Sequence, residues 1–466
     1  MKNMDSELLK LCGFEPEEIK RESLRVDKAF DILEISEEDT DRAKAKIERY
    51  FDIALPSMRK VLGLWLKELI DMVLAKEEGK KVIYVSYPPI PQIVAAMALT
   101  SDEIYCSSPD IVLSNTLNLL FDKINPVLET AEKNGLAPGI AFCSYLQTRL
   151  GSIVKGIVPK PDLLIPSCFL CDLTPATDQL LHEMYGTPVA YIDNLIDERG
   201  DRWPDEINPR KVKYFAREMA NSIETYTEVT GYELPDDEVR EAVGIADKIH
   251  YMCGQIQELR KADPLPFSQS DYHLAMSLTN IGRGLREGPE ILEGLIGDLE
   301  ERIEAGEGIV EKGAPRVMLV MIPHEPALAA TIAELGLAAC VHAGAAPRGP
   351  SRPVEYTALW EQVADGSMRG RGANYSSLAY ILQLVDAVKA WNVEGVIFFR
   401  HFSCRQYSIF PIRAKQVIEE ELQIPVLSLE GDYCDFRSYN VQGMRTRLET
   451  FAEMVKSERA HRERNR

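Results

Sequence analysis

Nine cysteines are the residues of this chain best suited to carry chemistry. An ionised thiolate is a soft, anionic ligand for iron or zinc, whereas a neutral buried thiol behaves as a small apolar side chain. In a long chain from a reducing compartment they do not form a disulfide framework, so each is either a packed thiol or a metal ligand. The cysteines are Cys12, Cys106, Cys143, Cys168, Cys171, Cys253, Cys340, Cys404 and Cys434.

Three of these cysteines closely follow short apolar runs that are typical of β-strands. The pairs of run and cysteine are 140–142 with Cys143, 163–165 with Cys171, and 396–399 with Cys404. Because ligands collect at the carboxyl ends of strands in open parallel sheets, we expect the three thiols to converge. Three thiolates are enough to hold an iron–sulfur cluster when one iron keeps an exchangeable position.

Cys168 stands three residues before Cys171, a C-x-x-C spacing that also occurs in redox dithiols and in zinc sites. A zinc site built from such pairs would need a second C-x-x-C, which the sequence lacks. Cys168 is therefore a candidate additional ligand. With Cys106, Cys340 and Cys434, the chain also holds enough thiols for a larger cluster, provided that several of them converge.

Polar residues near the same strand ends are candidates for proton transfer. His401 lies three residues before Cys404, where it could hydrogen-bond or protonate a bound group. Glu430 and Asp432 follow the apolar run 426–429 and could act as a base or orient a ligand. Carboxylates at strand ends also cap loops, and that alternative stays open.

Four basic residues near the cysteines could meet the phosphates of an acidic ligand, because cations of this kind bind phosphate in otherwise acidic proteins. Ordinary surface salt bridges are the competing interpretation. The four residues are Arg149, Lys155, Arg400 and Arg405. Neither a GxxxxGK[ST] motif nor a GxGxxG motif after a strand occurs, so any ATP hydrolysis would belong to a partner.

The overall composition disfavours several classes of partner. With 73 acidic and 53 basic residues, the chain carries a formal net charge of −20, which disfavours binding to nucleic acid or to an anionic membrane. No apolar run approaches the roughly 20 residues that span a bilayer, and the first residues lack the apolar core of a signal peptide. We therefore expect a cytoplasmic protein.

The elements that position these residues divide the 466-residue chain into four segments. We expect a helical N-terminal region over 1–75, a first α/β domain over 76–204, a helical insert over 205–312 and a second α/β domain over 313–466. The insert is expected to break at 263–266 and 282–288, where proline and glycine gather. The fold class is α/β, with two Rossmann-like parallel sheets.

The two α/β segments resemble each other, which predicts a duplication. Val82-Ile-Tyr-Val-Ser-Tyr-Pro-Pro-Ile-Pro91 matches Val317-Met-Leu-Val-Met-Ile-Pro-His-Glu-Pro326 at a constant offset of 235 residues. Thr187-Pro-Val-Ala-Tyr-Ile-Asp193 pairs with Ile424-Pro-Val-Leu-Ser-Leu-Glu430 at an offset of 237. Short strand-plus-proline patterns also recur by chance in large α/β proteins, and this is the alternative.

Taken together, the motifs resemble the D-component family of 2-hydroxyglutaryl-CoA dehydratase, which also includes benzoyl-CoA reductase subunits and double-cubane cluster proteins. The resemblance covers about 80 to 460. The segments that carry it are Phe142-Cys-Ser-Tyr-Leu-Gln-Thr-Arg-Leu-Gly151, 161–172, Gly186-Thr-Pro-Val, 393–404, Ile424-Pro-Val-Leu-Ser-Leu-Glu-Gly-Asp-Tyr433 and 445–451.

The resemblance implies a [4Fe–4S] cluster on Cys143, Cys171 and Cys404 in a cytoplasmic enzyme of an anaerobe. It also implies an acyl-CoA substrate, a homologous second subunit or a homodimer, and a separate ATP-hydrolysing iron–sulfur activator. One electron from that activator would form a ketyl radical on the thioester carbonyl and make an inert β-hydrogen acidic, so that a lyase of this type can eliminate water.

Two alternatives within the family stay open. The chain could belong to an ATP-coupled reductase of the benzoyl-CoA reductase or double-cubane type, or it could be a structural partner subunit without catalysis of its own. In the duplicated half, the position that corresponds to Cys143 falls near Asn374-Tyr-Ser-Ser377, where family members often carry a cysteine. The loss of that thiol disfavours the larger cluster.

Overall fold

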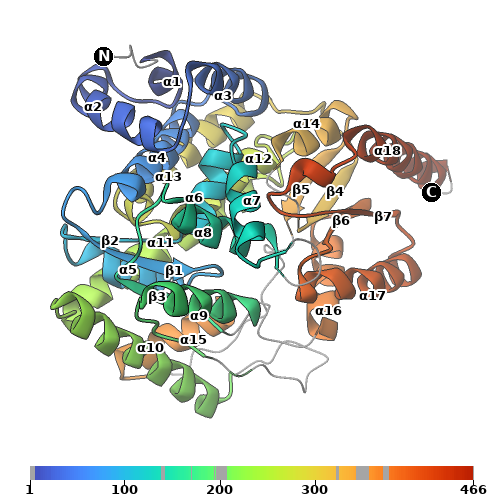
Figure 1. Cartoon of the computed structure of the whole chain (residues 1–466). Helices are drawn as coiled ribbons and strands as arrows, with labels where there is room; N and C mark the ends of the chain where they lie inside the picture. The colour runs from blue at the N-terminus through green and yellow to red at the C-terminus, as the bar shows by residue number, and fades with distance from the viewer. Residues whose placement is uncertain are drawn as a thin grey trace.

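The computed structural model describes residues 6–137, 142–168, 171–193, 195, 207–321, 325–342, 356–370 and 377–464. The confirmed fold class is α/β, because two parallel sheets are embedded in a largely helical chain (Figure 1). No helix in the described ranges is long and apolar enough to cross a membrane. The predicted strand over 140–142 lies mostly outside these ranges, since residues 140 and 141 are not described.

The first sheet has the strand order β2-β1-β3, and all its strands are parallel. The strands are β1 (Lys81–Ser86), β2 (Ile104–Ser107) and β3 (Leu163–Pro166). Beyond β3, two isolated parallel bridges join Leu164 to Val189 and Ser167 to Ile192. The run 189–192 therefore occupies the fourth position of this sheet without forming a continuous ladder.

The second sheet has the strand order β5-β4-β6-β7 and is also parallel throughout. Its strands are β4 (Arg316–Val320), β5 (Ala338–His342), β6 (Gly395–His401) and β7 (Val426–Gly431). This order matches the first sheet position by position, with the run 189–192 in the place of β7. The shared topology supports the predicted duplication, because chance strand-and-proline patterns would not reproduce a crossover order.

Helices cover both faces of the second sheet. Alternate residues of a strand point to opposite faces, and Met318 and Val320 accordingly pack with helices α16 and α17, whereas Val317 and Leu319 pack with α14 and α18. The helices of this half are α14 (Pro326–Glu334), α15 (Leu359–Gly370), α16 (Ser377–Ala390), α17 (Arg405–Leu422), the 3₁₀ turn η5 (Phe436–Ser438) and α18 (Val441–Arg464).

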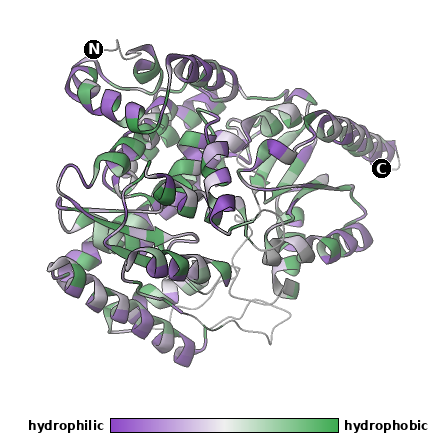
Figure 2. Cartoon of the chain, in the orientation of Figure 1, coloured by the Kyte–Doolittle hydropathy of each residue, from purple (hydrophilic) through white to green (hydrophobic). Residues whose placement is uncertain are grey.

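The first sheet shares one large hydrophobic core with the N-terminal helices and the insert. Figure 2 shows this division: apolar residues gather on the strands and on the helix faces that meet them, and hydrophilic residues lie on the outer turns. The helices of the first α/β segment are α5 (Pro91–Leu99), α6 (Pro109–Leu113), the π-helical turn η1 (Ser114–Asn118), α7 (Asn125–Lys133), α8 (Ser144–Lys155) and α9 (Leu173–Tyr185).

The N-terminal region is helical, as predicted. Ser36 and Asp39 form a reciprocal capping box at the start of α3, which satisfies amides that the helix itself leaves unpaired. The helices are α1 (Ser6–Leu11), α2 (Pro16–Ile32), α3 (Glu37–Tyr50) and α4 (Pro56–Leu74).

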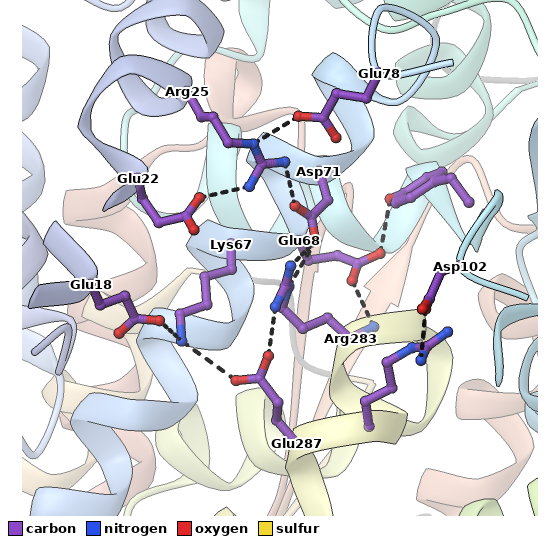
Figure 3. Close-up of polar contacts among 12 residues, drawn as sticks. Glu18, Glu22, Arg25, Lys67, Glu68, Asp71, Glu78, Asp102, Arg283 and Glu287 are labelled. Atoms are coloured by element: carbon purple, nitrogen blue, oxygen red, sulfur yellow. Dashed lines mark hydrogen bonds and ion pairs between the residues drawn. The ribbon is translucent and has the colours of Figure 1, made fainter. Parts of the chain in front are cut away.

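Ion pairs tie these helices to the insert, as Figure 3 shows. The Asp71 carboxylate of α4 forms an ion pair with Arg25 of α2 at 2.9 Å. It forms a second ion pair with Arg283, which lies in helix α13 (Gly282–Glu304) of the insert. The buried Glu68 accepts the Tyr105 hydroxyl at 2.8 Å and the Arg283 backbone N–H at 2.9 Å. A buried carboxylate is tolerated only when it is hydrogen-bonded in this way.

The insert consists of α10 (Pro209–Thr230), α11 (Asp236–Leu259), α12 (Gln269–Met276), the 3₁₀ turn η2 (Ser277–Asn280) and α13 (Gly282–Glu304). The predicted break at 282–288 is wrong, because these residues form the first turns of α13. The glycines there allow close packing: a β-carbon at Gly282 would lie 2.9 Å from the carbonyl oxygen of Cys106, and one at Gly284 would overlap the carbonyl of Leu278. Tertiary packing outweighs their low helix propensity.

Helix α15 crosses from the second half of the chain to the first. It packs on α10 and α11 of the insert, and Figure 1 shows it beside α10 under the first sheet. Leu359, Val363, Ala364 and Met368 of α15 belong to the core of the first sheet. The segment 313–466 therefore contributes one helix to the other half.

Candidate functional site

Exposure separates the nine cysteines into two groups. None of them forms a disulfide. Cys12, Cys106, Cys253, Cys340 and Cys434 are buried, and Cys106 and Cys340 lie on strands inside the cores of the two sheets. The four cysteines that are partly exposed are the three predicted ligands, Cys143, Cys171 and Cys404, together with the candidate Cys168.

The three predicted ligands all stand at helix N-termini. Cys143 is the N-cap residue of α8 and Cys404 is the N-cap residue of α17. Cys171 comes two residues before the first residue of α9. Unpaired backbone N–H groups and the helix dipole favour negative charge at these ends, so the three positions suit thiolates or an anionic group bound to them.

The charges that act on Cys143 include those of the other two predicted ligands. Burial raises the pKa of Cys143 well above its ordinary value, and the charges of Asp432, Cys171 and Cys404 raise it further. Three thiolates and a carboxylate in a shielded place repel one another. Such a group needs a cationic centre to become stable, as a metal–thiolate site provides.

Cys168 has a different environment from Cys171. Its backbone N–H donates to the Ile192 carbonyl at 2.8 Å, and so it belongs to the edge of the first sheet. Burial raises the pKa of Cys168 to about 12, with further contributions from Asp193, Asp178 and the charge of Cys171. Cys168 thus lies close enough to Cys171 to feel its charge.

Asp432 joins the surroundings of two of the cysteines. It follows β7 and is buried. Its Oδ1 accepts the Ser144 backbone N–H at 3.2 Å and also the Ser144 hydroxyl, and its Oδ2 accepts the Ser403 hydroxyl. Ser144 directly follows Cys143 and Ser403 directly precedes Cys404. One carboxylate therefore contacts the neighbour of a cysteine in each half.

An apolar cluster closes one side of the site. Tyr145, Tyr433 and Cys434 form it, with Cys143 packed against them. The rings of Tyr145 and Tyr433 lie 5.0 Å apart between centroids, and Tyr87 stacks on Tyr145 at 4.5 Å. This aromatic surface excludes water from beside Cys143, which strengthens electrostatic interactions there.

His401 and Glu430, the two residues predicted to transfer protons, lie in different environments. His401 is fully buried, stacks on Tyr433 and donates Nε2–H to the Met321 carbonyl at 2.7 Å. Burial lowers the pKa of His401 to about 3, so the ring is neutral near pH 7. This position favours a packing role. Glu430 is exposed and pairs with Arg400 at 3.2 Å, whereas Asp432, two residues later, points to the cysteines.

Three of the four predicted phosphate-binding cations, Arg149, Lys155 and Arg400, have carboxylate partners. Arg149 is fully buried and pairs with Asp110 and Asp178, each at 2.9 Å, so it lies inside the protein and away from any surface ligand. Lys155 pairs with Glu34 at 3.0 Å. The side chain of Arg405 is outside the described part of the structure.

Arg149 nevertheless belongs to the electrostatics of the site. Although burial lowers the pKa of Arg149, Asp110 and Asp178 raise it above its ordinary value, and the charge of Cys171 adds to them. A buried guanidinium therefore lies within electrostatic range of Cys171. Burial raises the pKa of Asp178 to about 6, although Arg149 opposes that change.

The register of the sheets makes Cys171 and Cys404 equivalent, which the sequence analysis missed. Leu163 pairs with Ile83 in the first sheet, and Val396 pairs with Met318 in the second. Cys171 lies eight residues after Leu163, and Cys404 lies eight residues after Val396. The segments Cys168-Phe-Leu-Cys171 and His401-Phe-Ser-Cys404 therefore correspond, and their shared Phe-x-Cys was the available signal.

The roles of Ser144 and Ser403 were also missed. The signal was their adjacency to predicted ligands, but a serine beside a cysteine is common and its partner, Asp432, is distant in sequence. The counterpart of Cys143 near 374–377 lies outside the described residues apart from the backbone of Ser377. No symmetric partner for Asp432 was predictable from the duplication, because the aligned position is Leu195.

The three predicted ligands do not form a single-ion site in the described part of the chain. Among the described residues, no group of three His, Cys, Asp or Glu side chains converges on one point as ligands of a single ion do. In a cluster each thiolate binds a different iron, so its ligands stand around a larger volume. Three partly exposed thiols at helix N-termini, within electrostatic range of one another, fit that requirement.

Comparison with known proteins gives one family and several relatives. The family described as 2-hydroxyglutaryl-CoA dehydratase, D-component, matches residues 91–455, a range that contains the four partly exposed cysteines. The (R)-phenyllactyl-CoA dehydratase alpha subunit of Clostridium sporogenes is 22% identical over 341 residues, covering 70% of this chain and 79% of the relative.

Two further relatives have similar coverage. The (R)-2-hydroxyisocaproyl-CoA dehydratase alpha subunit of Clostridioides difficile is 21% identical over 344 residues, which is 70% of this chain and 80% of the relative. The lactoyl-CoA dehydratase subunit alpha of Anaerotignum propionicum is 23% identical over 369 residues, which is 72% of this chain and 82% of the relative.

Proposed function

Because this chain belongs to the 2-hydroxyglutaryl-CoA dehydratase D-component family, we propose that it is the [4Fe–4S]-binding subunit of a 2-hydroxyacyl-CoA dehydratase. Cys143, Cys171 and Cys404 are the proposed ligands. The observation that carries the proposal is that these three cysteines are partly exposed, start or precede helices and lie within electrostatic range of one another.

The proposed reaction removes water from the 2-hydroxyl and a β-hydrogen of an acyl-CoA thioester, after a partner that hydrolyses ATP supplies one electron. The electron is returned when the double bond forms. A bound cluster would supply a Lewis-acidic iron and single-electron transfer. The residues of this chain hold the thiolates at helix N-termini, and the tyrosine cluster keeps water away from Cys143.

The burial of the remaining cysteines favours one cubane over a larger centre. Cys340 is buried on β5 and its Sγ lies 3.7 Å from the Val317 carbonyl, and Cys434 bonds the Ser114 hydroxyl at 3.1 Å. A larger centre would have to recruit such packed thiols. All three relatives described above are alpha subunits by name, so we also propose that this chain works with a second subunit.

Iron and acid-labile sulfide analysis of the protein purified without oxygen tests this proposal. We expect about four irons and four sulfides per chain, with the brown absorption of a cluster. Zinc in stoichiometric amount without sulfide would refute it. Adding the activator, ATP and 2-hydroxyacyl-CoA to chain and partner subunit should then give the enoyl-CoA, whereas a reductase would give a reduced acyl chain.

A further inference from the structure

We propose that Asp432 is a positioning residue that fixes Cys143 and Cys404 relative to each other. The inference rests on the proposed function, because it assigns the purpose of holding the two thiols to cluster binding. Asp432 acts through Ser144 and Ser403.

The hydrogen bonds of Asp432 to Ser144 and Ser403 join the two halves of the chain, and we call this three-residue connection the clamp. Ser144 belongs to the first half and bonds Oδ1, while Ser403 belongs to the second half and bonds Oδ2. The carboxylate is planar and rigid, so the two serines stand at a fixed spacing. Because each serine is covalently adjacent to a ligand cysteine, the spacing of the serines sets that of the cysteine backbones.

Helix capping gives the same conclusion by a second route. Cys143 and Cys404 are N-cap residues whose side chains make no capping hydrogen bond. In α8, Asp432 instead accepts the first helical amide, that of Ser144. A capping side chain normally comes from the N-cap residue itself. Here a distant carboxylate satisfies the first helical N–H of α8, directly beside the Cys143 position.

Further bonds immobilise the clamp. The Tyr433 backbone N–H donates to Asp432 Oδ1 at 2.5 Å, and the Cys434 backbone N–H donates to the Ser144 hydroxyl at 2.8 Å. The Asp432 carbonyl accepts the Tyr439 hydroxyl. A carboxylate buried near the Cys143 and Cys434 thiols is costly, and it is retained only where its hydrogen bonds are satisfied. Packing alone would be served by an apolar side chain.

Comparison of Asp432→Ala with Asp432→Asn tests the proposal in the complete chain. The alanine variant removes the hydrogen bonds to both serines. We expect its iron to pass to a chelator about tenfold faster than iron in the parent protein, because residues that orient metal ligands usually have effects of this size. Asp432→Asn keeps the acceptor oxygen for Ser144, and its NH2 group can donate to the Ser403 hydroxyl, so this variant should stay near the parent rate. Asp271→Ala is the matched control, because Asp271 is a buried aspartate held by Ser268 far along the chain.

A second measurement separates this inference from the proposed function. In the reduced, iron-free protein, mass spectrometry can follow iodoacetamide alkylation at each cysteine. Asp432→Ala should raise the rates at Cys143 and Cys404 several-fold above those of Asp432→Asn, which removes the same charge, and both variants should leave Cys171 unchanged. Asp271→Ala should change none of the rates. If the purified protein lacks iron and sulfide, the proposed function fails, but these rates still decide the clamp.

Variants that remove one serine hydroxyl at a time keep the test decisive if Asp432→Ala does not fold. Ser144→Ala should raise alkylation mainly at Cys143, and Ser403→Ala mainly at Cys404. If Cys143 and Cys404 are alkylated at the parent rate in all three variants, and iron transfer is also unchanged, the assignment of Asp432 is overturned.

Discussion

The two sheets share a strand order but differ in what they bring to the site. At the equivalent position, the first sheet has Cys168 and Cys171, whereas the second has His401 and Cys404. The first half alone provides Cys143 and the buried Arg149, and the second alone provides Asp432. The difference teaches that a repeated scaffold can supply equivalent ligand positions, while the residues that make a site chemically specific need not be repeated.

The largest expected effect comes from removing a ligand from either half. Cys143→Ser, Cys171→Ser and Cys404→Ser should each lose most of the iron, because a hydroxyl cannot replace a soft, anionic donor. Iron content and the visible spectrum measure this. Cys253→Ser is the control, since its thiol lies in α11 near the Ala275 carbonyl and a hydroxyl can bond there. Normal iron in all three variants would refute the site.

Arg149→Met should strongly destabilise the first half. It would leave Asp110 and Asp178 buried without their cation, which costs about 3 to 5 kcal/mol of unfolding free energy. Arg400→Met in the second half removes a partly exposed pair with Glu430 and should cost less than about 1 kcal/mol. Urea unfolding of the iron-free proteins gives both values, and equal losses would contradict the contrast.

Asp178 should make the stability of the first half depend on pH. Its pKa is raised to about 6 by burial, so the folded protein binds its proton more tightly than the unfolded chain does. The resulting stabilisation is fully present below about pH 4, the unfolded value, and is lost as pH rises through about 6. Asp178→Asn should flatten this dependence in urea titrations between those values.

The matched position in the second half sharpens this test. Pro411 stands where the alignment of Cys171 with Cys404 places Asp178, so the second half has no carboxylate there. A pH dependence that survives unchanged in Asp178→Asn would show that another group causes it.

The smallest expected effect is that of Cys168→Ser, which makes the first half more like the second. His401 shows that a cysteine is not needed at this position for the second half to present Cys404. The variant should keep its full iron content and its absorption, because Cys168 is not one of the three proposed ligands. Loss of half the iron would instead indicate a larger centre.

Short apolar runs bounded by turn residues predicted most of the strands. The apolar runs around Val82, Val317, Val396 and Val426 are strands, and the N-terminal helices form as expected. Strands β2 and β5 were missed, because Ile104-Tyr-Cys-Ser107 is only four residues long and Ala338-Ala-Cys-Val-His342 begins with alanines that favour helix. Their pairing with β1 and β4 is a long-range property.

The candidate site was predictable where residue type and strand position agreed. Cys143, Cys171 and Cys404 were selected because they follow predicted strands, and all three are partly exposed. The basic residues were not predictable in the same way: Arg149 is enclosed by Asp110 and Asp178, and both partners lie about thirty to forty residues away along the chain. Local sequence does not record which charges the fold will bring together.

Helix α15 has a consequence for the order in which the chain can fold. A ribosome releases the N-terminal residues first, and domains generally begin to fold as they emerge. The core around the first sheet includes Val363, Ala364 and Met368 of α15, which packs on α10. During synthesis, that face of α10 therefore remains uncovered until nearly four-fifths of the chain has been made, although the strands of the first sheet have been complete since Pro166.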